Sequence, residues 1–261
     1  MQVIDSLAKL SLVSVFFFNY QLTIGLALAS NIISVILSTT YGLKQEHKKL
    51  PLIFPKVYLK KIFSFAKWIG LSRVFGVAVS RIDILLLNLI HSSFAAGIFA
   101  AASRVGLVFA LIVSSLGSVV SPRFSAFTKR SETISYLKKL FLLVSLISIV
   151  MLLMVILAKP IILLVFGIKY QEAIPVFQVL TIALIPFLFS IITSTPIIYT
   201  YNQPSFFAKI TILQTVTLVT LDILLIPSLG AFAPAISLGV SNVLILLLGG
   251  LRLRKLLQKN V

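Results

Sequence analysis

Long, uninterrupted apolar runs constrain this chain more than any other feature. Residues 141–157 contain no charged side chain and would leave no polar face on a helix. Only α-helices and closed β-barrels satisfy their backbone groups in hydrocarbon, and barrel strands alternate strictly over segments of about ten residues. The runs therefore predict an all-α polytopic membrane protein. Composition agrees, because 59% of the 261 residues are hydrophobic and only 11% are charged, against about a quarter charged in soluble domains.

Turn signals divide the chain into eight candidate membrane spans, since a spanning helix needs about 20 apolar residues. They cover residues 7–18, 21–43, 62–88, 94–120, 140–158, 173–200, 205–226 and 231–251, and the first is marginal in length. We expect residues 44–61 to form a basic cytoplasmic linker, residues 62–251 a six-helix unit, and residues 252–261 a basic cytoplasmic tail.

Lysine and arginine predict the orientation of these spans. One side of an eight-pass chain holds fifteen basic residues: Lys44, Lys48, Lys49, Lys56, Lys60, Lys61, Arg123, Lys129, Arg130, Lys138, Lys139, Arg252, Arg254, Lys255 and Lys259. The other side holds only Lys159 and Lys169. Cytoplasmic loops retain basic residues, so the rich side and both termini are expected in the cytoplasm. The same rule explains the net charge of +17 without nucleic acid, which we do not expect as a partner.

Several kinds of chemistry lack their usual residues. There is no cysteine and no Gly-rich phosphate loop that ends in Lys-Ser or Lys-Thr. His47 and His91 have no clustered ligands, so we expect no metal site and no cofactor. Four of the six acidic residues lie in loops or near the amino terminus. Paired catalytic carboxylates are therefore not expected, and we do not expect an enzyme.

Two arginines lie deep in predicted spans. Arg73 and Arg104 each lie roughly 15 Å from the end where their segment enters the membrane, and no acidic residue lies at the same depth. We expect them to face a cationic cavity that binds an anion, because a charge at mid-membrane costs at least about 2.5–3.5 kcal/mol and faces a bundle interior or a wet cavity. The alternative is that each guanidinium binds backbone carbonyls or extends to the headgroups.

The third span carries a polar face at helical spacing, which we expect to line the same path. Its members, Lys67, Gly70, Arg73, Ser80, Arg81 and Asn88, fall within about 140° of arc, and Asp83 lies outside it. Arg81 also lies near the outer helix end, where it can extend to the headgroups. On the seventh span Thr211, Thr215 and Asp222 align, with Gln214 beside them. Interhelical packing explains them more simply than sugar binding, although Asp83 and Asp222 are also candidates for ion coupling.

Four motifs, in order, are similar to those of one family of membrane proteins. They are Arg81-Ile82-Asp83 with the leucines after it, Ala96-Gly97 through Ser103-Arg104, Pro122-Arg123-Phe124, and Phe166-Gly167 through Leu180. With this order and spacing, residues 56–250 resemble the polysaccharide biosynthesis and lipid-linked oligosaccharide flippases. That family lies within the superfamily of multidrug and oligosaccharidyl-lipid exporters.

The resemblance implies a fold and an activity. Such proteins have twelve or more helices in two six-helix lobes around a central cavity, and they move undecaprenyl-diphosphate-linked glycans across the bacterial inner membrane by alternating access. Residues 62–251 then resemble the carboxy-terminal lobe, and residues 1–43 resemble the last two helices of an amino-terminal lobe. On that template four helices are missing, so we expect a truncated or partial member. Arg104 lies where relatives line their cavity with basic residues.

Two other functions remain open at this point. A multidrug or cation exporter of the same superfamily would hold its cargo with buried carboxylates. A non-transporting scaffold would recruit polysaccharide polymerases or glycosyltransferases through its basic cytoplasmic face.

Overall fold

The computed structural model describes residues 2–18, 23–46, 56–127 and 129–259, and all its regular structure is helical. Its contacts divide the chain into two compact units, Met1–Lys60 and Lys61–Val261. Of the predicted basic linker, residues 47–55 lie outside the described part, and with them Lys48 and Lys49.

The amino-terminal unit is a pair of packed helices, α1 (Gln2–Phe18) and α2 (Ile24–Glu46). Three serines at i, i+4 and i+8 on α2 are buried: Ser30, Ser34 and Ser38. Small residues at this spacing let two helix backbones approach closely in a membrane. Ser34 also donates a hydrogen bond of 2.8 Å to the Asp5 carboxylate on α1.

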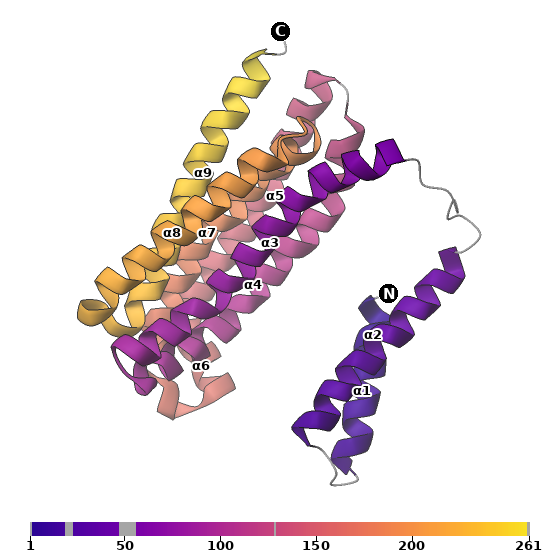
Figure 1. Ribbon diagram of the computed structural model, residues 1–261. Coiled ribbons are helices and arrows are strands. Elements are labelled where there is room, and N and C mark those ends of the chain that lie inside the picture. Colours follow the sequence, from indigo (N-terminus) through magenta and orange to yellow (C-terminus); the bar gives the residue numbers. More distant parts are fainter. Residues whose placement is uncertain (1, 19–22, 47–55, 128, 260–261) are drawn as a thin grey trace. The chain divides into compact units, whose positions relative to one another are not determined.

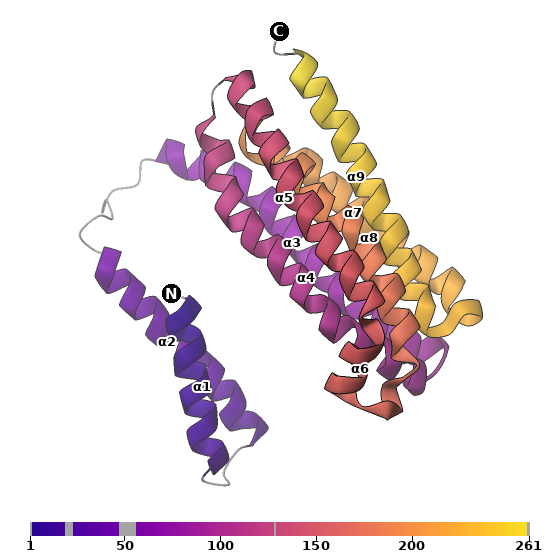
Figure 2. The ribbon, with the colours of Figure 1, turned by 180° about the vertical axis from the view of Figure 1, so that it is seen from behind.

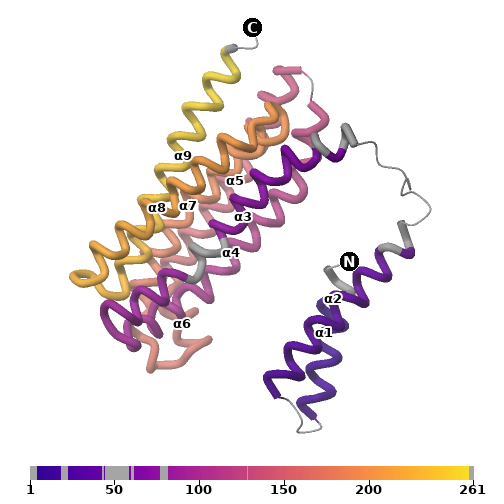
Figure 3. The backbone as a smooth tube through the Cα atoms, in the orientation of Figure 1, coloured from indigo at the N-terminus to yellow at the C-terminus, as the bar shows by residue number. Residues whose placement is uncertain are grey.

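Six long helices form the carboxy-terminal unit (Figure 1). They are α3 (Lys56–Ile90), α4 (Ser93–Ala126), α5 (Arg130–Ile156), α7 (Ala173–Tyr199), α8 (Pro204–Leu229) and α9 (Ala233–Lys259). They run alternately in opposite directions, as the backbone trace in Figure 3 shows. The ends of α3 at Lys56, of α5 at Arg130 and of α9 at Lys259 thus meet at one end of the bundle, which we call the basic end.

Each of the eight predicted spans corresponds to one long helix, although several helices extend beyond the predicted limits. By length and composition, five helical stretches of the described residues are able to cross a membrane: 24–42, 93–126, 130–156, 173–199 and 204–258, the last of which contains both α8 and α9. The chain is a multi-pass membrane protein.

The sequence did not predict the short helix α6 (Ala158–Phe166) and the 3₁₀ turn η1 (Ile168–Tyr170) between α5 and α7. Viewed from behind, α5 descends to α6 at the end of the bundle opposite the basic end (Figure 2). Gly167, which joins α6 to η1, has a φ of +79°, a conformation that costs glycine little. A second 3₁₀ turn, η2 (Gly230–Phe232), joins α8 to α9.

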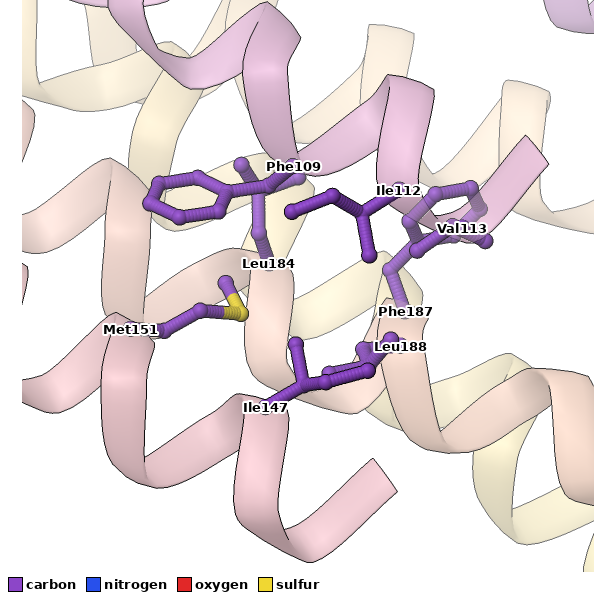
Figure 4. A pocket seen from close by; sticks show the side chains of 8 residues that line it. All are labelled: Phe109, Ile112, Val113, Ile147, Met151, Leu184, Phe187 and Leu188. Carbon is purple, nitrogen blue, oxygen red and sulfur yellow. The ribbon is translucent and has the colours of Figure 1, made fainter. Parts of the chain in front are cut away.

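Helix α7 lies at the centre of the unit and packs against α4, α5 and α9. Figure 4 shows the junction of α4, α5 and α7, where apolar side chains meet and leave no room for a water molecule. The side chains are those of Phe109, Ile112, Val113, Ile147, Met151, Leu184, Phe187 and Leu188. This junction is part of the packed core and offers no polar group to a ligand.

Helix α9 packs tightly against α7 at Gly249. A Cβ atom there would lie 2.7 Å from Thr193 Oγ1 and 3.1 Å from Thr193 Cβ. At the adjacent Gly250 a Cβ would meet nothing within 4 Å. The two glycines therefore form a matched pair for testing the contact between α7 and α9.

We predict that Gly249→Ala destabilises the protein by about 1–3 kcal/mol, the usual cost of overpacking, because α7 and α9 must separate to admit the methyl group. The measurement is thermal unfolding in detergent, where this cost lowers the Tm by several degrees in a chain of this size. Gly250→Ala is the control and should leave the Tm unchanged or slightly raised. Equal Tm values for the two variants would contradict the observed helix contact.

Candidate functional site

Two aspartates are buried together near the end of the bundle opposite the basic end. Asp83 on α3 is 7% exposed and Asp222 on α8 is 0% exposed. Each lies seven residues before the end of its helix, at Ile90 and Leu229, so the two carboxyl groups lie at the same depth. They are close enough to interact electrostatically. The Ser237 side chain on α9, also fully buried, neighbours Asp222. We call Asp83, Asp222 and Ser237 the acidic cluster.

The acidic cluster lacks the hydrogen bonds that satisfy other buried polar groups. Within the described part of the chain, Asp83 Oδ1, both carboxyl oxygens of Asp222 and Ser237 Oγ have no hydrogen-bond partner in close geometry, although Asp222 interacts at longer range with Asp83 and with Ser237. Elsewhere in the core, Ser148 and Thr181 donate to carbonyls four residues earlier at 2.8 Å. An unpaired buried polar group costs roughly 1–3 kcal/mol, and a charged one more. The cluster is therefore suited to a proton or a small cation.

The described residues provide few other groups to neutralise these carboxyls. No Lys or Arg there forms an ion pair with either aspartate, and no group of three or more His, Cys, Asp or Glu suitable for a metal occurs among them. Carboxylate and hydroxyl oxygens are ligands for hard cations. Two carboxyls and one hydroxyl can share protons or bind a small ion, but they do not complete a transition-metal site.

A second polar group ties three helices together without an unsatisfied atom. Gln214 on α8 donates to the side-chain oxygen of Asn242 on α9 at 2.9 Å. Asn242 in turn donates to the Ala183 carbonyl on α7 at 2.9 Å. Thr215 donates to the Thr211 carbonyl of its own helix at 2.9 Å. Gln214 and Thr215, two residues proposed for coupling or packing, are thus occupied by hydrogen bonds within and between helices.

The structure places both deep arginines on exposed faces of their helices. Arg73 and Arg104 are both exposed on the carboxy-terminal unit, and neither forms an ion pair or hydrogen bond with any side chain that the structure describes. The buried charges of the bundle are acidic instead. The physical reason is that each arginine lies on the outward stripe of its helix, whereas Asp83 lies on the inward face of α3.

The other predicted site residues on α3 also divide into exposed polar residues and one buried aspartate. On α3, Lys67, Gly70 and Asn88 are exposed together with Arg73, while Asp83 is buried. The side chains of Ser80 and Arg81 lie outside the described residues.

Helix α4 carries three exposed polar residues on one face, which we call the polar stripe, although the exposed Leu111 shares that face; the sequence pattern did not lead us to predict it. Arg104, Ser115 and Ser118 are all exposed, and at 100° per residue they fall within about 60° of arc. Ser118 donates to the Ser115 carbonyl at 2.7 Å. Spacing from Arg104 at i+11 and i+14 would have revealed this stripe, since both intervals return to nearly the same helix face. The stripe extends the exposed polar surface along α4 toward the basic end.

Comparison with known protein families assigns the chain to one family. A family model described as "Polysaccharide biosynthesis protein" matches residues 2–175, about two thirds of the sequence. The chain belongs to this family. No curated protein and no solved structure matches it. The matched region of this polysaccharide biosynthesis protein includes Asp83, Arg73 and Arg104, whereas Asp222 and Ser237 lie beyond it.

A double-mutant cycle tests whether the two aspartates interact. Neutralising either carboxyl with Asp83→Asn or Asp222→Asn relieves the same unfavourable pairing, so we predict that the two effects on the free energy of unfolding are not additive. We expect an interaction energy of about 0.5–3 kcal/mol, typical of residues in contact. The measurement is unfolding of the purified protein in detergent.

The control cycle pairs Asp83→Asn with Glu172→Gln, because Glu172 is an exposed acid at the start of α7. Those two effects should add. If the effects of Asp83→Asn and Asp222→Asn on the free energy of unfolding were also additive, the two carboxyls would not be in contact between α3 and α8.

Proposed function

We propose that this protein is a transporter, not an enzyme, that moves an undecaprenyl-diphosphate-linked oligosaccharide across the bacterial cytoplasmic membrane for surface polysaccharide assembly. Membership of the polysaccharide biosynthesis family supports the pathway, and the multi-pass helical fold supports transport. The observation that carries the proposal is Arg104, an exposed guanidinium without a protein partner among the described side chains, about a third of the way along the 34-residue α4.

A guanidinium at this depth needs an anion or water. Arg104 lies eleven residues from Ser93, or roughly 16 Å along the helix, too far for its side chain to reach the headgroups easily. Charged side chains within spans mark substrate or ion pathways by default. A diphosphate offers oxygen acceptors that match the fork of a guanidinium. Arg104 is therefore proposed to bind the diphosphate, with Arg73 on α3 as a second contact.

The acidic cluster is proposed to couple transport to a cation gradient. Two unsatisfied carboxyls in an apolar bundle favour a bound proton or small ion, and loss of that ion would leave like charges facing each other between α3 and α8. This repulsion would disfavour the present packing of α3 against α8 and favour a conformation in which the two helices lie further apart. Such a change of packing with ion occupancy is what alternating access requires.

A cation or drug exporter is the second candidate, because the buried charges are carboxyls rather than arginines. Burial limits what they can bind, however. Asp222 is 0% exposed, so an organic cation would need a large opening at that point, whereas a proton would not. The cluster fits a coupling ion better than a bulky cationic cargo.

We predict that Arg104→Ala lowers export of the lipid-linked glycan by about tenfold or more, because a charge-assisted hydrogen bond to the diphosphate contributes roughly 1.5–3 kcal/mol. The assay is surface polysaccharide in a strain that lacks its own copy of the gene. Arg254→Ala, which removes an exposed arginine at the basic end, is the control and should export normally. Full export by Arg104→Ala at normal protein abundance would refute the assigned role.

Asp222→Asn should separate coupling from substrate binding. We predict that this variant exports at least about tenfold less glycan, because one positioned proton-transfer group commonly contributes two or more orders of magnitude. Purified Asp222→Asn should still bind the lipid-linked oligosaccharide, whereas Arg104→Ala should bind it weakly. Loss of binding in Asp222→Asn with unchanged binding in Arg104→Ala would reverse the two roles and favour the cation exporter.

A further inference from the structure

Helix α6 and the turn η1 form an apolar projection where the chain would otherwise meet water. Helix α6 has nine residues, so it is only about 13 Å long and cannot cross roughly 30 Å of hydrocarbon. It follows directly after α5, whose 27 residues already suffice to span. The chain therefore reaches α6 at the membrane surface opposite the basic end.

One face of α6 is fixed to the bundle. Ala158 and Ile162 are fully buried, and Phe166 packs against the same core. Gln178 on α7 donates to the Val155 carbonyl at 3.0 Å, which satisfies one of the carbonyls left open where α5 ends. These contacts hold α6 at a defined place rather than leaving it as a loose connection.

The opposite face of α6 is apolar and exposed. Leu164 is 88% exposed, and Leu157 and Pro160, which share its face at helical spacing, are exposed too. Ile168 in η1 is 79% exposed. The outward face of a helix at an aqueous surface is normally polar. Contact with water alone does not explain this composition.

Two observations identify the covering medium as lipid. First, the exposed apolar surface of α5, which includes Ile149, Leu153 and Ile156, continues without a polar break into Leu157 of the α6 face. Second, exposed Lys159 and Lys169 flank the patch, where they complement the phosphates of lipid headgroups. Tyr170, stacked against Phe166 at 5.4 Å, is of the residue type enriched at membrane interfaces.

We propose that α6 and η1 lie in the phospholipid interface, with Leu164 and Ile168 about 5–10 Å into the acyl boundary and Lys159 and Lys169 at the phosphates. The hairpin would hold the end of α5 and the start of α7 at a fixed depth. This surface binds phospholipid and is separate from the arginine stripe and the acidic cluster.

Spin labels test the depth directly, because the chain contains no cysteine and one introduced cysteine is labelled uniquely. The full chain carrying Leu164→Cys is reconstituted into phosphatidylcholine and phosphatidylglycerol vesicles, and collisions with oxygen and with a water-soluble nickel chelate are measured. Leu146→Cys on α5, an exposed position ten residues and roughly 15 Å before the helix end at Ile156, is the deep control, and Gln171→Cys is the aqueous control. The label at 164 should give a depth between the two.

Three results would overturn the proposal. Nickel access at 164 equal to that at 171 would place α6 in water. Access to neither oxygen nor nickel would mean that a protein surface covers it, either a partner or a second copy. Oxygen access equal to that at 146 would place it deep in the acyl chains.

The lysines have their own test. Combining Lys159→Gln and Lys169→Gln with the label at 164 should raise nickel collisions about twofold, since the neutral side chains are no longer attracted to the charged headgroups. Unchanged collisions would refute the assignment of these lysines to the phosphates.

Discussion

Hydrocarbon offers no hydrogen bonds, and this constraint governs the whole molecule. Each helix satisfies its own backbone, and hydroxyl side chains donate back to their own helix, as Ser30 does to the Leu26 carbonyl and Ser148 to the Val144 carbonyl. Polar side chains that form hydrogen bonds between helices have their bonding groups paired, as in the hydrogen bonds from Gln214 to Asn242 and from Asn242 to the Ala183 carbonyl. Polar groups that break this rule therefore indicate function.

Two sets of residues break it, in opposite ways. The acidic cluster is buried without hydrogen-bond partners among the described residues, whereas Arg73 and Arg104 are exposed on spans where an apolar side chain would be cheaper. Helix α3 carries one residue of each set, since Asp83 and Arg73 lie ten positions apart. Under the proposed function, a shift of α3 that follows ion binding at Asp83 would move Arg73 as well. Ion binding and substrate binding would then be coupled through this one helix.

The sequence predicted the fold better than the site, for physical reasons. Apolar runs and turn residues located all eight long helices, because a spanning helix must be apolar over its whole length. Helix α6 was missed, since the six apolar residues 161–166 after Lys159 and Pro160 are too few to indicate a separate helix. Depth along a helix follows from residue count, and the equal depth of Asp83 and Asp222 was available from the sequence. The proximity of Asp83 and Asp222 could not be predicted from the sequence, because it depends on which faces of α3 and α8 pack together.

The arginines show the same limit from the other direction. Residue count placed Arg73 and Arg104 deep in their spans, but it did not tell which way they point. The expectation that they would face a cationic cavity rested on the cost of a lone charge in hydrocarbon. Both side chains lie on exposed faces of their helices, and under the proposed function water or a bound anion meets them there.

Under the proposed function, the polar stripe of α4 faces water inside the membrane. Its most direct test is the reaction rate of a single cysteine at Ser115→Cys with a charged, membrane-impermeant thiol reagent, compared with Leu142→Cys on α5. These exposed positions lie eleven and twelve residues from the helix ends at Ala126 and Arg130, so their depths match. We expect fast modification at 115 and slow modification at 142, because only a hydrated thiol ionises and reacts. Equally slow modification at both positions would place the stripe against lipid and refute a hydrated path along α4.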